Sequence, residues 1–180
     1  MKAFWIASSV LIAATVALAA DAPAPPKVGD PAPDFSLPYA TQDSIASDDL
    51  KLSAIEGKRN IILAFYPADW SGGCTKEVCS LRDNFTALSS MNADVLGISG
   101  DSPFSHYEWA KFHKLPFRLL SDHKHEVAPK YASYDPGSGF NKRTVYAIDK
   151  SGKIAYIDLH YSPRDEASLN KLRDALSKKQ

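Results

Sequence analysis

The chain has 180 residues and a mass of 19.7 kDa, a length that suits a single domain. Its 21 basic and 21 acidic residues give a formal net charge of zero, which argues against a strongly basic nucleic-acid-binding protein, so no nucleic-acid partner is expected. Two cysteines exclude a disulfide-rich scaffold and a four-cysteine zinc site. With 44% apolar residues, the chain is expected to fold around a substantial core.

Residues 1–19 are interpreted as a secretory signal peptide. Lys2 precedes eighteen uncharged residues, and Ala17-Leu18-Ala19 supplies a small-residue cleavage site. The alternative is a retained membrane anchor, because eighteen residues are near the minimum for crossing a bilayer. The sequence therefore predicts an exported, periplasmic protein that does not associate with the membrane after cleavage.

Residues 20–33 contain five prolines, at positions 23, 25, 26, 31 and 33, and are interpreted as an extended linker. The folded domain is then expected to occupy residues 34–180, with its first ordered residues between Val28 and Phe35.

Hydrophobic periodicity predicts the elements of this domain in chain order. The apolar run 59–66 predicts a central strand covered on both faces, and residues 71–89 predict a helix with one apolar stripe. There follow a strand at 93–99, a helix from Pro103 to about Leu115, a strand at 118–121, a short helix at 125–132, a turn at 135–141, hairpin strands at 143–149 and 153–160, and a helix at 165–177. This order predicts an α/β protein with a thioredoxin-like fold, in which helices cover both faces of a mixed central sheet.

The segment from Pro67 to Cys79 joins the first buried strand to its helix. Ser71 is a natural N-cap residue, which places Cys74 in the first helical turn, where unpaired N–H groups and the helix dipole favour a thiolate. Gly72 and Gly73 allow a small ligand to approach the sulfur closely, and Pro67 can shield it from water. The alternative is that Cys74 is a small core residue on the apolar stripe.

A structural disulfide between Cys74 and Cys79 does not suit an intact helix. Five helical residues separate the two Cα atoms by roughly 8.6 Å, whereas a disulfide requires less than about 7 Å. The bond would therefore require local unwinding, while the small loop that it closes is worth only about 2 kcal/mol. A bond that forms and breaks during a catalytic cycle fits this spacing better than a structural one.

These residues resemble a known family. Pro67, Ser71 and Cys74 are similar to the Pro-x-x-x-Thr/Ser-x-x-Cys signature of the peroxiredoxins, and Arg143 resembles the arginine of their active site. Cys79 matches the resolving cysteine of the bacterioferritin comigratory protein, or peroxiredoxin Q, subfamily. The resemblance runs from about residue 27 to residue 178.

The resemblance implies a thiol peroxidase that reduces hydrogen peroxide and organic hydroperoxides. Cys74 would become a sulfenic acid, Ser71 and Arg143 would help to bind the peroxide oxygens, and Cys79 would form an intramolecular disulfide. Glu77 is expected either to orient Arg143 or to complement the helix dipole as an ordinary first-turn acid. A thioredoxin-like protein would act as the reductant, and neither a cofactor nor a metal is expected. The protein is expected to be a monomer.

Two alternatives belong to other functional classes. An exported thioredoxin-fold copper-binding chaperone would use both cysteines and a distant histidine such as His160, but the spacing here is Cys-x4-Cys rather than Cys-x3-Cys-Pro. A thiol–disulfide exchanger would carry a Cys-x-x-Cys motif, which this sequence lacks. Trp70, beside the site, is expected to pack under the loop.

Overall fold

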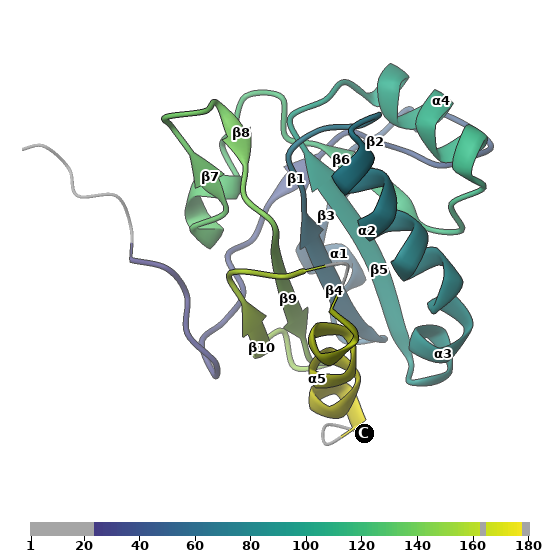
Figure 1. Cartoon of the computed structure of the whole chain (residues 1–180). Helices are drawn as coiled ribbons and strands as arrows, with labels where there is room; N and C mark the ends of the chain where they lie inside the picture. Colours follow the sequence, from purple (N-terminus) through teal and green to yellow (C-terminus); the bar gives the residue numbers. More distant parts are fainter. Residues whose placement is uncertain (1–23, 163–164, 178–180) are drawn as a thin grey trace, which may run out of the picture.

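The computed structural model describes residues 24–162 and 165–177 (Figure 1). The helices are α1 (Leu52–Ile55), α2 (Gly72–Asp83), α3 (Phe85–Ser90), α4 (Pro103–His113) and α5 (Glu166–Ser177), with a 3-10 turn at Ala128–Tyr131. The strands are β1 (Ser36–Leu37), β2 (Tyr39–Ala40), β3 (Leu50–Lys51), β4 (Asn60–Phe65), β5 (Ala93–Ser99), β6 (Arg118–Ser121), β7 (Tyr134–Asp135), β8 (Phe140–Asn141), β9 (Thr144–Ile148) and β10 (Ile154–Asp158).

A six-stranded mixed sheet has the order β10-β9-β4-β5-β6-β2. Strands β4, β5 and β6 run parallel, whereas β9 is antiparallel to β4, and β10 and β2 are antiparallel to their neighbours. Every residue of β4 and of β9 is buried, because helices or other segments cover both faces of the sheet there. The predicted α/β, thioredoxin-like fold is confirmed.

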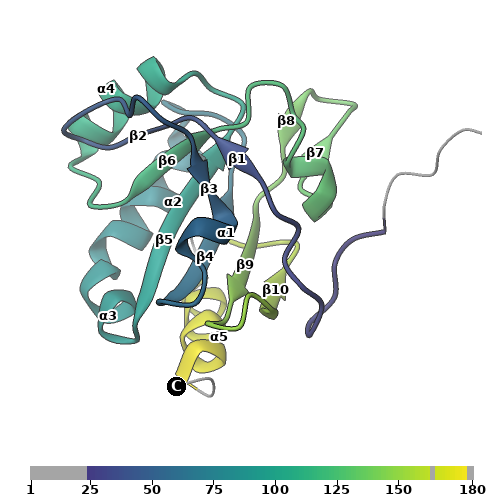
Figure 2. The same cartoon turned by 180° about the vertical axis from the view of Figure 1, so that it is seen from behind.

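The long helices all pack on one face of the sheet. Helices α2, α4 and α5 share one hydrophobic cluster with Ile62 and Ala64 of β4. On the opposite face, Ile61 and Leu63 of β4 belong to a second cluster, which also contains residues of α1, the 3-10 turn and β1. Figures 1 and 2 show the two faces in turn. The strand order advances in one direction from β4 to β5 to β6, so right-handed crossovers place α2, α3 and α4 on the same side.

Three local predictions differ from the structure. The helix expected at 71–89 is divided at Asn84, whose side-chain amide and backbone N–H both donate to the carbonyl of Ser80, at 2.9 and 3.1 Å. The short helix expected at 125–132 is reduced to the 3-10 turn, and the turn expected at 135–141 carries the small hairpin β7–β8. The sequence analysis also missed β1, β2, β3 and α1.

The N-terminal part of the described chain is paired with the domain. Gly29 N donates to Ile154 O at 2.8 Å, and Ala32 N donates to Gly152 O at 2.9 Å. The second half of the expected linker therefore lies against the β9–β10 hairpin. The expected signal peptide and residues 20–23 lie outside the described residues. Among the helices of the described ranges, none is long and apolar enough to cross a membrane.

Candidate active site

Cys74 lies in the first turn of α2, as its sequence context predicts. Ser71 adopts an extended conformation, and its hydroxyl accepts a hydrogen bond from the backbone N–H of Cys74 at 3.2 Å. The side chain therefore acts as the N-cap and fixes the start of α2, which follows the loop 66–71 after β4. Cys74 is buried, so its sulfur is held away from bulk water.

Arg143 is brought to this sulfur by the pairing of β4 with β9. Thr144 pairs with Phe65 at the end of β4, so the residue before Thr144 lies beside the loop that leads to α2. The Nη2 atom of Arg143 donates to Cys74 Sγ at 3.2 Å. The guanidinium therefore contacts the sulfur directly.

Glu77 holds the other branch of the guanidinium. Arg143 Nη1 donates to Glu77 Oε2 at 2.5 Å, and the Glu77 side chain is fully buried. Burial raises the pKa of Glu77 to about 7, although the Arg143 charge and hydrogen bond act in the opposite direction. The expected contact between Glu77 and Arg143 is thus present, and Arg143 is oriented by a carboxyl group on one side and a sulfur on the other.

Glycine at position 73 makes room for Arg143. A Cβ atom added to Gly73 would lie 2.7 Å from Arg143 Nη2, closer than such contacts normally occur. Gly72 is exposed and has open space around the corresponding position. The requirement for glycine is therefore specific to Gly73, where the guanidinium crosses the helix start.

Pro67 directly follows the buried Tyr66 at the end of β4 and is half-buried. This position starts the loop that carries Ser71 and Cys74. That Pro67 shields the Cys74 sulfur from water stays a prediction.

Cys79 lies one and a half turns further along α2, and both cysteines are free thiols. Burial raises the pKa of the half-buried Cys79 above 9.0. Its sulfur lies 3.8 Å from Nδ1 of His113, in the last turn of α4. Helix α2 is continuous from Cys74 to Cys79, so the Cα separation calculated for an intact helix applies to these two residues.

Trp70 does not pack under the loop, contrary to expectation. It is 54% exposed and adopts a positive φ of 59°. Its ring centroid lies 5.8 Å from that of Phe112 and 6.4 Å from that of His113. The left-handed backbone at Trp70 directs the ring outward across the end of α4 instead of beneath the loop.

A buried polar network holds the loop between β4 and α2, and the sequence analysis missed it. Asp69 and His106 are fully buried side chains joined by a 2.9 Å contact between Oδ2 and Nδ1. The Asp69 carboxylate also accepts hydrogen bonds from Tyr66 and Ser105. His106 Nε2 faces the carbonyl oxygen of Leu120 at 3.1 Å, so both nitrogens of this buried ring have an oxygen partner.

The 37 positions between Asp69 and His106 explain why no local pattern reveals this network. His106 lies in the stretch 103–113, which also contains His113, and nothing in the local sequence indicates which residue His106 contacts. The two residues come together because α4 packs against β6, next to the loop 66–71.

The structure does not favour a metal centre. Within residues 24–162 and 165–177, no three His, Cys, Asp or Glu side chains converge as a metal site, and the exposed His160 does not join the two cysteines. Arg143 beside Cys74 would also repel a cation.

Comparison with known proteins identifies the family. The AhpC/TSA family model matches residues 28–157. Peroxiredoxin Bcp of Escherichia coli is 36% identical over 158 residues, which cover 83% of this chain and 97% of that protein. A peroxiredoxin Q of rice, described as chloroplastic, is 40% identical over 132 residues, which cover 72% of this chain but 57% of the rice protein. This chain therefore matches little more than half the length of that plant relative.

Solved structures agree with these relatives. Peroxidoxin BcpB from Mycobacterium tuberculosis superposes with a TM-score of 0.75 at 29% identity, covering 86% of this chain and 99% of that one. Plasmodium yoelii thioredoxin peroxidase I gives a TM-score of 0.75 at 25% identity, covering 84% of this chain and 91% of that one. The matched residues include the cysteine loop, and the chain belongs to the AhpC/TSA family, among relatives named peroxiredoxin Bcp and peroxiredoxin Q.

Proposed function

We propose that this protein is a thiol-dependent peroxidase that reduces hydrogen peroxide and organic hydroperoxides, with Cys74 as the nucleophile. The observation that carries the proposal is the 3.2 Å contact between Arg143 Nη2 and Cys74 Sγ at the start of α2. A thiolate held by a guanidinium and by the N-terminal end of a helix is the nucleophile that peroxide reduction requires. The names of the relatives in the AhpC/TSA family support the same activity.

In the first step, the Cys74 thiolate attacks the terminal oxygen of the hydroperoxide. The sulfur–oxygen bond forms as the oxygen–oxygen bond breaks, the peroxide is reduced to an alcohol or water, and the sulfur is oxidised to a sulfenic acid. Arg143 stabilises negative charge that moves from the sulfur to the leaving oxygen. Cys74 is buried, while the side chain of Arg143 that contacts its sulfur is 26% exposed.

The neighbouring residues act as positioning groups in this step. Glu77 holds the guanidinium through Oε2, and Ser71 fixes the helix start and offers its hydroxyl near the reacting oxygens. Pro67 limits the access of water to the sulfur.

In the second step, Cys79 attacks the sulfenic acid, giving an intramolecular disulfide and water. Cys74 and Cys79 both lie in α2, where ideal geometry separates their Cα atoms by roughly 8.6 Å. The first turns of α2 must therefore unwind before the disulfide can form, since its Cα atoms lie within about 7 Å of each other.

The remaining expectations concern the cellular setting. A thioredoxin-like protein is proposed to reduce the disulfide, and the chain is proposed to act as a monomer. The charged, then apolar, N-terminal sequence supports periplasmic export with removal of residues 1–19 and no later membrane association.

The proposal is tested with the reduced protein, one equivalent of hydrogen peroxide, and mass spectrometry. Wild type should lose two hydrogens as it forms the Cys74–Cys79 disulfide, whereas Cys79→Ser should gain one oxygen as the sulfenic acid. Cys74→Ser should gain nothing and should show no peroxide consumption. Turnover by Cys74→Ser would refute the assignment of the nucleophile. A disulfide-linked dimer in wild type would refute the intramolecular second step.

A further inference from the structure

His113 lies beside Cys79, and the two proposed steps give it no role. Its Nδ1 atom lies 3.8 Å from Cys79 Sγ, within contact distance for a hydrogen bond to sulfur. The ring centroids of Phe112 and Trp109 lie 4.9 and 5.8 Å from that of His113, both in edge-to-face arrangements. Aromatic side chains and the Cys79 sulfur thus surround a half-buried imidazole.

Helix α2 is attached to this end of α4 through the main chain as well. Arg82 Nη1 donates to the carbonyl oxygen of His113 at 2.8 Å, and Arg82 lies three residues after Cys79 on α2. The contact between Cys79 and His113 is therefore supported one turn further along α2. This anchor lies beyond the turns of α2 that must unwind around Cys74.

Burial and a neighbouring positive charge favour the neutral form of the His113 ring. Burial, and to a smaller extent the charge of Arg82 on α2, lower the pKa of His113 below 6.5. Asp83 is also on α2, and it pairs with Arg82 at 2.8 Å. On α4 itself, Lys111 is exposed and contacts the hydroxyl of Tyr107. At neutral pH, a neutral imidazole therefore lies beside a neutral Cys79 thiol.

We propose that His113 is the catalytic base of the second step and accepts the proton of the Cys79 thiol as Cys79 attacks oxidised Cys74. This inference rests on the proposed function. The proton moves from Sγ to Nδ1, and the Cys79 sulfur then forms a bond to the Cys74 sulfur. The sulfur–oxygen bond of the sulfenic acid breaks, and the leaving hydroxide takes a proton from solvent and departs as water, while the proton on His113 is returned to solvent. The oxidising equivalent comes from the peroxide consumed in the first step.

A base is needed because the thiolate is the attacking species in disulfide formation. Burial disfavours the thiolate of Cys79, so the free thiol would supply little of it at neutral pH. A positioned base commonly contributes on the order of 10²-fold or more to the rate of such a step. The partial exposure of His113 gives the transferred proton a route to solvent.

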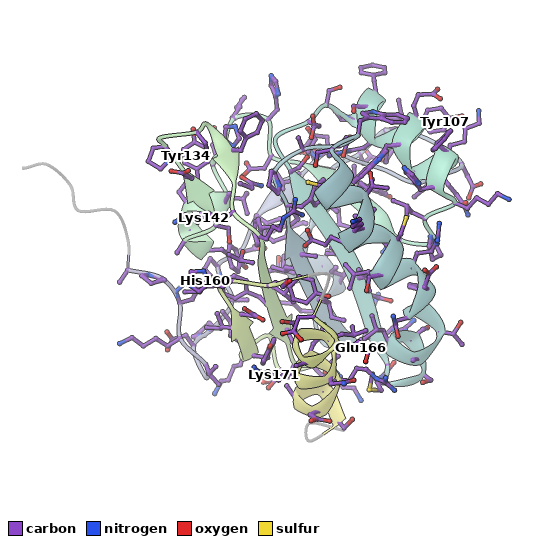
Figure 3. All side chains as sticks on the ribbon, in the orientation of Figure 1. Tyr107, Tyr134, Lys142, His160, Glu166 and Lys171 are labelled. Carbon is purple, nitrogen blue, oxygen red and sulfur yellow. The ribbon has the colours of Figure 1, made fainter. Side chains whose placement is uncertain are left out.

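The test is a single-turnover experiment on reduced full-length protein between pH 5 and pH 9.5. One equivalent of hydrogen peroxide is added, and quenched samples are separated by mass into thiol, sulfenic acid and disulfide. His113→Gln keeps a polar side chain of similar size but cannot act as a base. His160→Gln is the matched control, because His160 is exposed and lies across the molecule from Tyr107 of α4 (Figure 3).

In wild type, the rate of disulfide formation should rise through a pKa below 6.5 and then level off. In His113→Gln, it should be lower by about 10²-fold at pH 7 and should rise with pH as the Cys79 thiol ionises. Added imidazole should restore part of the rate at pH 7, while His160→Gln should match wild type throughout.

Disulfide formation at the wild-type rate in His113→Gln overturns the inference. A rate lowered by the same factor at every pH also overturns it, because that result indicates a packing role for His113. Sulfenic acid formation at Cys74 is measured in the same samples. The absence of both sulfenic acid and disulfide in wild type refutes the proposed function, whereas normal oxidation of Cys74 followed by unaltered resolution in His113→Gln refutes the inference alone.

Discussion

Replacement of Glu77 by Gln should change how the stability of the reduced protein depends on pH. Burial raises the pKa of Glu77 from its ordinary 4.5 to about 7. Between these values the folded state retains a proton that the unfolded state releases, so the free energy of unfolding falls as pH rises. At about 1.4 kcal/mol per pH unit, the difference between the two pKa values lowers the free energy of unfolding by about 3 kcal/mol by pH 8.

Glu77→Gln removes this titration while it leaves an oxygen for Arg143 Nη1. Urea denaturation of both reduced proteins between pH 4 and pH 8.5 should therefore show the stability of wild type falling relative to the variant by about 3 kcal/mol. The matched control is Glu108→Gln, because Glu108 is exposed on α4. Its stability should remain parallel to that of wild type.

Two results would refute this reasoning. A stability difference between wild type and Glu77→Gln that is the same at pH 4 and pH 8.5 would mean that Glu77 does not titrate differently on folding. A difference that shifts in favour of wild type as pH rises would mean that attraction to Arg143 outweighs burial and keeps Glu77 ionised.

The remaining predictions concern the position of Arg143 and the loop. Gly73→Ala should lower the rate constant of Cys74 oxidation by roughly tenfold in stopped-flow measurements, because its Cβ would displace Arg143 Nη2, at 2.7 Å; a wild-type rate would contradict this steric argument. Arg143→Lys should lower the same rate constant by about 10²-fold while near-ultraviolet circular dichroism stays native, since a lysine cannot contact the sulfur and Glu77 as a fork; retention of activity would remove Arg143 from the site. Asp69→Asn should lower the free energy of unfolding by about 2 kcal/mol, because an amide has one acceptor oxygen and cannot replace both carboxylate oxygens that contact Tyr66, Ser105 and His106; an unchanged urea midpoint would show that these buried contacts are not needed for stability.

The sequence by itself predicts the α/β class and most of the central elements. The strands at β5 and β6 have the predicted boundaries, because short apolar runs between turn residues have few alternatives in a buried sheet. The first-turn position of Cys74 was also predictable, since Ser71 as an N-cap is a local signal that depends on neighbouring residues alone.

The short N-terminal elements were not predictable in the same way. Strands β1, β2 and β3 have two residues each, too few for an alternating pattern to emerge. Pairing with distant partners defines them, as when Tyr39 and Ala40 join β6. Helix α1 is likewise a single turn, which tertiary packing rather than helix propensity stabilises.

The site shows the same division between local and tertiary information. Local sequence determined the N-capped helix start, the cysteine in its first turn and the glycine beside it. Tertiary structure alone decided that His106 pairs with Asp69 and that His113 faces Cys79. The contacts of Arg143 with Cys74 and Glu77 also depend on tertiary structure, and only the family resemblance indicated them beforehand. Each of these contacts spans more than 30 positions of the chain, so the pairing of β4 with β9 and the packing of α4 create contacts that no local spacing records.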